Sequence, residues 1–161
     1  MLEDFVENNG LGFIKKGSPS EHTGILFDGA QPHNTLLIPY EGCVVEVGSI
    51  APRSLMNSLR LSPSFGFIRI PLQSSWPRII FDSRKNNIAA IHTLPSRASL
   101  SHTPMLEGSF ASHFTISTSE DIGSNLQYLF TPDIMAQLID QTAEYDMEIS
   151  GNNFYLYRNE P

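Results

Sequence analysis

The sequence has few charged residues, a single cysteine and no long apolar run. Charged residues make up 17% of its 161 positions, against about 25% in an average soluble domain. A single cysteine, Cys43, excludes a disulfide within the chain and favours a reducing compartment. No stretch approaches the ~18 consecutive apolar residues of a membrane-spanning helix, and the acidic N-terminus does not resemble a signal peptide. The sequence therefore predicts a soluble cytoplasmic protein whose length suits one domain, residues 1–161.

The motifs of common enzyme and metal sites are missing as well. No histidine or cysteine pair has zinc-ligand spacing, and no Gly-x-Ser-x-Gly elbow occurs. The segment Gly12–Ser18 has the glycine spacing of a phosphate loop but lacks the lysine after its second glycine. Asp133 and Asp140 share a face of one predicted helix, yet the helical rise separates their Cα atoms by roughly 10.5 Å, too far for one metal ion. We therefore predict no metal and no cofactor.

An enzyme stays open as the alternative. It would be hydrolase-like, with a site assembled from scattered histidine, serine and aspartate residues, because catalytic triads are defined by geometry and not by sequence order. The histidines that would have to meet a serine or a carboxylate are His92, His102 and His113.

Charge is segregated along the chain. The net charge is −7, which argues against general nucleic-acid binding. Residues 1–50 sum to −5, residues 51–100 to +6 and residues 101–161 to −8. One interpretation is that the basic middle pairs with the acidic ends across strands. The other is a basic patch for an anionic ligand, such as a phosphate or a membrane headgroup.

Short apolar or alternating runs separated by glycine, proline and asparagine predict strands through the first hundred residues. They lie at 11–15, 24–27, 35–38, 44–47, 65–72, 78–81 and 88–94. Pro71 favours a strand end or a sheet edge there, because it has no N–H to donate. A short helix is predicted at 54–61, and 95–105 has the composition of a loop.

The C-terminal third predicts the principal helix, at about 132–145. Thr131 suits the N-cap and Pro132 the first helical position, where its missing N–H costs nothing. We expect Ile134, Leu138 and Ile139 to be buried, and Asp133 and Asp140 to be exposed. A β-hairpin with its turn at 150–153 should follow. The fold class is therefore α+β, with mainly antiparallel sheet and the helix packed on one face.

The most site-like local cluster surrounds Trp76. Arg78, Asp82, Arg84, Lys85 and Asn86 follow it closely, and Arg69 adds a further cation nearby. The functional interpretation is a binding site for an anionic ligand. The architectural one is that Trp76 covers the sheet edge while Asp82 and Asn86 cap a turn.

Four segments carry a resemblance to a known family. They are LEGSF (106–110), HFTI (113–116), YLFTPDIMAQLID (128–140) and YDMEI (145–149). Together with WPRIIFDSRKNN (76–87), they resemble an uncharacterised family of bacterial α+β domains. The resemblance implies no activity, but it implies a soluble domain that often accompanies membrane-spanning segments elsewhere in the full protein. The sequence therefore favours a non-catalytic binding or regulatory module at the cytosolic face of a bacterial membrane, with an unknown protein or an anionic ligand as its partner.

Overall fold

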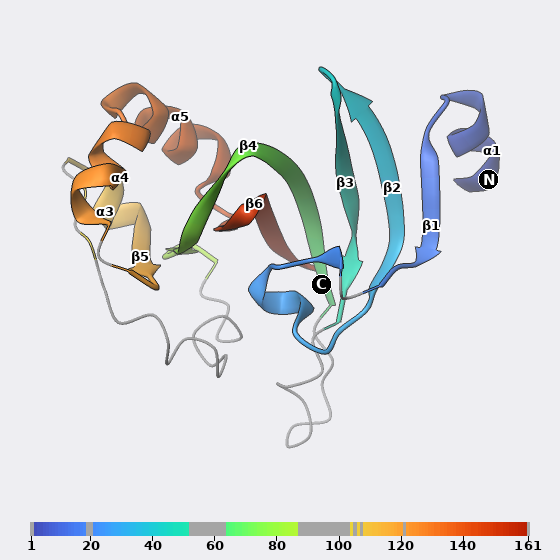
Figure 1. Cartoon of the computed structure of the whole chain (residues 1–161), viewed down its shortest axis with the longest axis horizontal. Coiled ribbons are helices and arrows are strands. Elements are labelled where there is room, and N and C mark those ends of the chain that lie inside the picture. The colour runs from blue at the N-terminus through green and yellow to red at the C-terminus, as the bar shows by residue number, and fades with distance from the viewer. Residues whose placement is uncertain are drawn as a thin grey trace.

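A computed structural model describes residues 2–18, 21–51, 64–86, 104, 106, 108–120 and 122–160. Figure 1 shows the arrangement of its helices and strands. In order they are α1 (Leu2–Asn8), β1 (Gly12–Lys16), the 3₁₀ helix η2 (Ile25–Phe27), β2 (Pro32–Tyr40), β3 (Cys43–Ile50), β4 (Ser64–Ser83), α3 (Phe110–His113), β5 (Phe114–Thr118), α4 (Gly123–Leu129), α5 (Pro132–Thr142) and β6 (Asp146–Glu160). The predicted helix at 54–61, the predicted strand at 88–94 and nearly all of the predicted loop at 95–105 lie outside the described residues.

The six described strands form one antiparallel sheet in the order β1-β2-β3-β4-β5, with β6 also paired to β4. β4 organises it, because its 20 residues are long enough to hold three partners. β6 follows one edge of β4 almost throughout, while β3 and then β5 pair with its other edge. The predicted α+β class with a mainly antiparallel sheet is confirmed.

β4 and β6 bend together, as the arch in Figure 1 shows. Pro71 pairs with Asn153 and Trp76 pairs with Gly151, so β4 uses more residues than β6 across this stretch. Extra residues on one strand bulge and bend it, and Gly151 supports the bend with a φ of 59°. The strands predicted at 65–72 and 78–81 are therefore one strand. The turn predicted at 150–153 is a bend within β6, because β4 continues past it as a pairing partner.

Two cores lie on opposite faces of this sheet. One contains η2 together with Phe65, Phe67, Tyr155 and Tyr157. The other lies under α3, α4 and α5, where Ile79, Phe81, Phe110, Phe114, Leu126 and Phe130 are buried. Alternation along a strand sends neighbouring side chains to opposite faces, so Ile80 joins the first core while Ile79 and Phe81 join the second.

The segment at 24–27 was predicted as a strand, and that prediction is wrong. Ile25, Leu26 and Phe27 are all buried, and the Phe27 N–H bonds to the Gly24 carbonyl at 3.0 Å. In a strand, successive side chains point to opposite faces of the sheet. This 3₁₀ turn instead directs three consecutive side chains into the same core.

α5 begins where the sequence predicts but is more exposed than expected. Asp133 and Asp140 are exposed, as predicted. Ile134, however, is 42% exposed, and Leu138 and Ile139 are half-buried, so their predicted burial is wrong. The reason is that residues of α3 and α4 already fill the core beneath, and α5 packs on its outside. Thr131 has the N-cap conformation, but its hydroxyl makes no capping hydrogen bond.

Candidate functional site

Two of the predicted site residues, Arg69 and Arg78, are each paired with a carboxylate. Arg69 lies 2.6 Å from Glu46, and Arg78 lies 3.1 Å from Glu148. Arg78 also donates to the Thr23 carbonyl at 2.6 Å. Arg69 donates to the Glu21 carbonyl at 3.4 Å, so both arginines help to hold the segment before η2 against the sheet.

Glu148 is the buried centre of this network. One of its oxygens accepts from the Ile25 N–H at 2.7 Å and from the Tyr157 hydroxyl at 2.9 Å. Burial raises the pKa of Glu148 to about 7, although the Ile25 N–H, Arg78 and the Tyr157 hydroxyl oppose the shift. The contacts of this carboxyl span β4, β6 and the chain before β2, so they fasten three separate segments.

His22 completes the same region. Its ring stacks on Phe27 with 4.1 Å between centroids. Burial, aided by the nearby Arg69, lowers the pKa of His22 to about 4, so the ring is neutral at pH 7. The sequence did not single out His22 or Glu148, because only the fold brings them to buried partners.

The remaining members of the predicted cluster lie further along β4 and in the turn after it. Asp82 is buried, and its charge adds to the burial that raises the pKa of Asp146 to about 7. Arg84 donates through Nε to the Ala111 carbonyl at 3.0 Å, and Lys85 is exposed. Asn86 donates to the carbonyl of Glu144 at 3.4 Å.

Trp76 is half-buried and packs against the core under the helices. The structure thus spreads the predicted cluster over the bend, the η2 contact and the end of β4. Binding of an anionic ligand by these residues stays a prediction.

The histidines of the enzyme alternative are only partly described. His92 and His102 lie outside the described residues. His113 ends α3, where its backbone carbonyl accepts from the Arg84 N–H at 2.8 Å. Within the described ranges, no group of three or more His, Cys, Asp or Glu side chains is placed to hold a metal ion.

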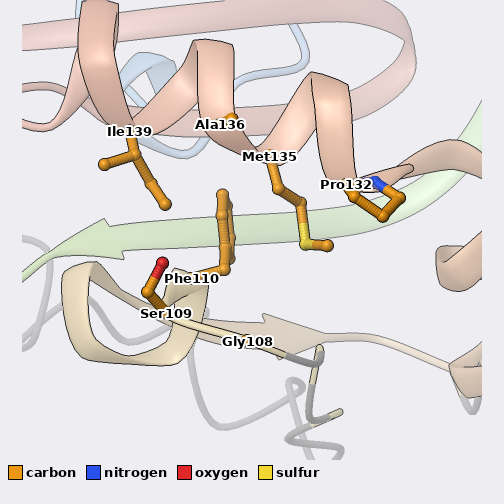
Figure 2. A pocket seen from close by; sticks show the side chains of 7 residues that line it. All are labelled: Gly108, Ser109, Phe110, Pro132, Met135, Ala136 and Ile139. Atoms are coloured by element: carbon orange, nitrogen blue, oxygen red, sulfur yellow. The ribbon is translucent and has the colours of Figure 1, made fainter.

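A hollow of about 320 Å³ lies between α3 and α5, and we call it the helix hollow. Figure 2 shows Met135 and Ile139 reaching down from α5 toward the ring of Phe110. Pro132, Ala136, Gly108 and Ser109 complete the lining. The side chains in its wall are apolar except for that of Ser109, which carries a hydroxyl.

A second apolar surface crosses the sheet on the face opposite η2. Strand register aligns one apolar side chain from each of five strands in a single row. This apolar row consists of Phe13, Leu36, Val47, Ile68 and Leu156, and every member is partly exposed. Leu156 also packs against the core under the helices, so the row continues that core across the sheet. Among the described elements, β2 and β3 make their main contacts with neighbouring strands. Figure 1 shows α3, α4 and α5 together at the β5 end and α1 beside β1.

The row borders a hollow of about 320 Å³, which we call the sheet hollow. Its apolar part is formed by Leu36, Val47, Ile68 and Leu156. Its polar part is formed by Asn34, Ser49, Tyr145 and Arg158, and Gly66 lies in register between Ser49 and Arg158. Because glycine has no side chain, this position leaves the floor of the hollow open.

Comparison with known proteins gives a fold likeness. No family model matches the chain, and no curated protein matches it. Among solved structures, the chain is similar to the mycobacterial trehalose monomycolate transport factor A, TtfA, with a TM-score of 0.61. The match has 7% sequence identity and covers 98% of this chain and 79% of TtfA. In the described part of the chain, no helix is long and apolar enough to cross a membrane. At this identity the likeness shows a shared fold alone.

Proposed function

We propose that this protein is a non-catalytic binding module that works at a membrane, with the apolar row as its contact surface. The row itself is the observation that carries the proposal. Partly exposed apolar residues are ordinary when scattered, but a contiguous strip is typical of a surface that contacts a partner, a ligand or a membrane. Five strands contribute to this one strip.

The ionisable groups with strongly shifted pKa values support binding rather than catalysis. Perturbed groups often mark active sites, although structural ion pairs perturb pKa values too. Here Glu148 and His22 lie in the network that holds η2. Asp146 accepts from the Ser83 N–H at 2.8 Å and so ties β6 to the end of β4. None of the three lines the helix hollow or the sheet hollow.

The membrane part of the proposal draws on two likenesses. TtfA is named as a transport factor for trehalose monomycolate, and the resemblance to the bacterial family implies a membrane-linked context. Both favour a bacterial membrane as the place of action, and the single Cys43, which favours a reducing compartment, is the reason to propose its cytosolic face. The partner there would be an apolar or anionic ligand, or another protein.

Vesicle sedimentation tests the proposal. The purified chain would be mixed with vesicles of phosphatidylcholine, with and without phosphatidylglycerol. We expect it to sediment with the vesicles and Val47→Glu to stay in the supernatant, because a carboxylate within the row is costly to desolvate. Val44→Glu is the matched control, since Val44 lies on the same strand, is 44% exposed and lies outside the row.

Two results would contradict the proposal. One is a wild-type chain that stays in the supernatant with both kinds of vesicle. The other is equal sedimentation of the wild type and Val47→Glu when circular dichroism shows both to be folded.

A further inference from the structure

The sheet hollow is charged at its β6 end and apolar along the row, with the neutral side chains of Asn34 and Ser49 beside the row. Leu36, Val47 and Ile68 line the middle of the sheet, whereas Tyr145 and Arg158 stand together at the end nearest α5. An elongated apolar chain with a polar head has the same division of surface. Small-molecule sites usually combine an apolar wall with a few placed polar groups in this way.

Arg158 is oriented but only weakly paired. Its guanidinium lies 5.6 Å from the centroid of the Tyr145 ring, and one of its nitrogens is 3.5 Å from the Tyr145 hydroxyl. Among the described side chains, Glu144 is its carboxylate partner at 3.9 Å, and the side chains of this pair are 59% and 67% exposed. Such an exposed ion pair contributes little. An anion that bonds to the guanidinium in a bidentate manner would therefore displace Glu144 at small cost.

The cations of this surface are few, and one of them lies at the hollow. Strand alternation brings Lys15 and Arg158 onto the same face as the apolar row, and the Glu144 carboxylate lies 3.9 Å from Arg158. Arg158 lines the sheet hollow, so it is the cation that an anionic head would meet there.

The size of the sheet hollow favours a single chain over a helix. Its volume of about 320 Å³ lies near the lower limit of small-molecule sites. One turn of an α-helix, about 10 Å across and 5.4 Å long, already fills roughly 400 Å³. An extended acyl chain is thinner and can follow the row between strands.

We propose that the sheet hollow binds a single-chain anionic amphiphile of the fatty-acid type. Its acyl chain lies along Leu36, Val47 and Ile68, and its carboxylate meets Arg158 beside Tyr145. This assignment rests on the proposed function and names the ligand class of the same surface.

Titration with dodecanoate tests the assignment. The chain would be titrated calorimetrically with monomeric dodecanoate, and separately with dodecyltrimethylammonium, which has a cationic head on an equally long chain. We expect dodecanoate to bind at least about tenfold more tightly, because a charge-assisted hydrogen bond contributes about 1.5–3 kcal/mol. Arg158→Gln should lose about tenfold in dodecanoate affinity, and Arg158→Lys should lose less, because lysine keeps the charge but not the bidentate geometry.

Three further variants locate the acyl chain. Val47→Glu should abolish binding, and Val44→Glu should leave it unchanged. Ala136→Glu places a charge in the helix hollow (Figure 2), so it should also leave binding unchanged. Circular dichroism confirms that each variant is folded before it is titrated.

The outcomes separate this inference from the proposed function. Loss of dodecanoate binding in Ala136→Glu but not in Val47→Glu would move the ligand to the helix hollow and overturn the inference. Equal dodecanoate affinities of Arg158→Gln and the wild type would overturn the proposed contact between the carboxylate of the ligand and Arg158. If dodecanoate does not bind but vesicles still sediment the chain, the inference fails while the proposed function stands. If neither binds, both fail.

Discussion

Replacing Arg78 by methionine should destabilise the protein, and by more at high pH than at low pH. Methionine keeps most of the apolar stem of the side chain but removes the guanidinium. The Thr23 carbonyl then loses its donor at 2.6 Å, and Glu148 loses the cation 3.1 Å away. Glu148 stays buried, with the Ile25 N–H and the Tyr157 hydroxyl as its remaining partners.

The size of the effect follows from these contacts. A hydrogen bond that involves a charged group contributes about 1.5–3 kcal/mol net. The Arg78 side chain is 29% exposed, so water compensates part of the loss. We therefore expect Arg78→Met to lower the free energy of unfolding by about 2–3 kcal/mol at pH 6.

The pH dependence comes from Glu148, whose pKa burial raises from 4.5 to about 7. A carboxyl with a raised native pKa contributes stability that is present at low pH and is lost as the pH rises through 7. Arg78 lowers this pKa, so removing Arg78 raises it further. Above pH 7 the native variant then keeps a proton that the native wild type has released. Between pH 6 and pH 8, the free energy of unfolding should consequently fall by about 1 kcal/mol more in the variant than in the wild type.

Urea denaturation at pH 6 and pH 8, followed by circular dichroism, measures both quantities. Arg69→Met is the matched control, because Arg69 also pairs with a carboxylate but Glu46 keeps 14% of its side chain exposed. The control should lose less stability than Arg78→Met at both pH values. A loss below about 0.5 kcal/mol for Arg78→Met, which is ordinary for surface positions, would refute the structural role of the network. An equal loss at pH 6 and pH 8 would refute the role given to Glu148.

Three further changes test other parts of the structure. Burial raises the pKa of Asp146 from 3.8 to about 7, so the native carboxyl should cost stability as the pH rises through 7. In urea titrations, the free energy of unfolding of Asp146→Asn should therefore rise by about 2 kcal/mol relative to that of the wild type between pH 5 and pH 8. The same pH dependence of stability in both proteins would contradict this. Gly24→Ala should cost about 1–3 kcal/mol in thermal melts, because the new Cβ would overlap the Tyr157 hydroxyl; an unchanged melting temperature would show that the segment shifts freely. Leu126→Ala, at a fully buried position of α4, should cost about 2–5 kcal/mol, whereas Ile134→Ala, at a position 42% exposed, should cost under about 1 kcal/mol; equal losses in urea titrations would refute the outer position of α5.

Local patterns predicted most of the strands. The alternation in β4 placed Phe65 and Phe67 on one face and Ile68 on the other, and the structure buries the first two while leaving Ile68 half-exposed. Pro71 was assigned to a strand end or an edge, and pairing with β3 does end at Arg69, just before it. β4 continues because β6 still pairs with it there, as Pro71 does with Asn153, and pairing with a strand so much later in the chain leaves no local signal.

The candidate sites depended much more on the tertiary structure. The cluster around Trp76 attracted attention because its charged residues are close in sequence, yet the strand separates them and Glu148 neutralises Arg78. The apolar row had a partial signal, since each member lies in a short apolar run. Only the register of five strands turns those isolated residues into one surface.

By itself, the sequence determined the class of the fold, the start of α5 at Thr131 and Pro132, and the exposure of Asp133 and Asp140. These depend on contacts within a few residues, such as helix starts and the two-residue period of a strand. The tertiary structure decided the bend of β4, the burial of Glu148 beneath η2 and the merely partial burial of the apolar face of α5. Each of these results from competition among distant segments for the same partner or the same core, and local pattern does not encode which segment prevails.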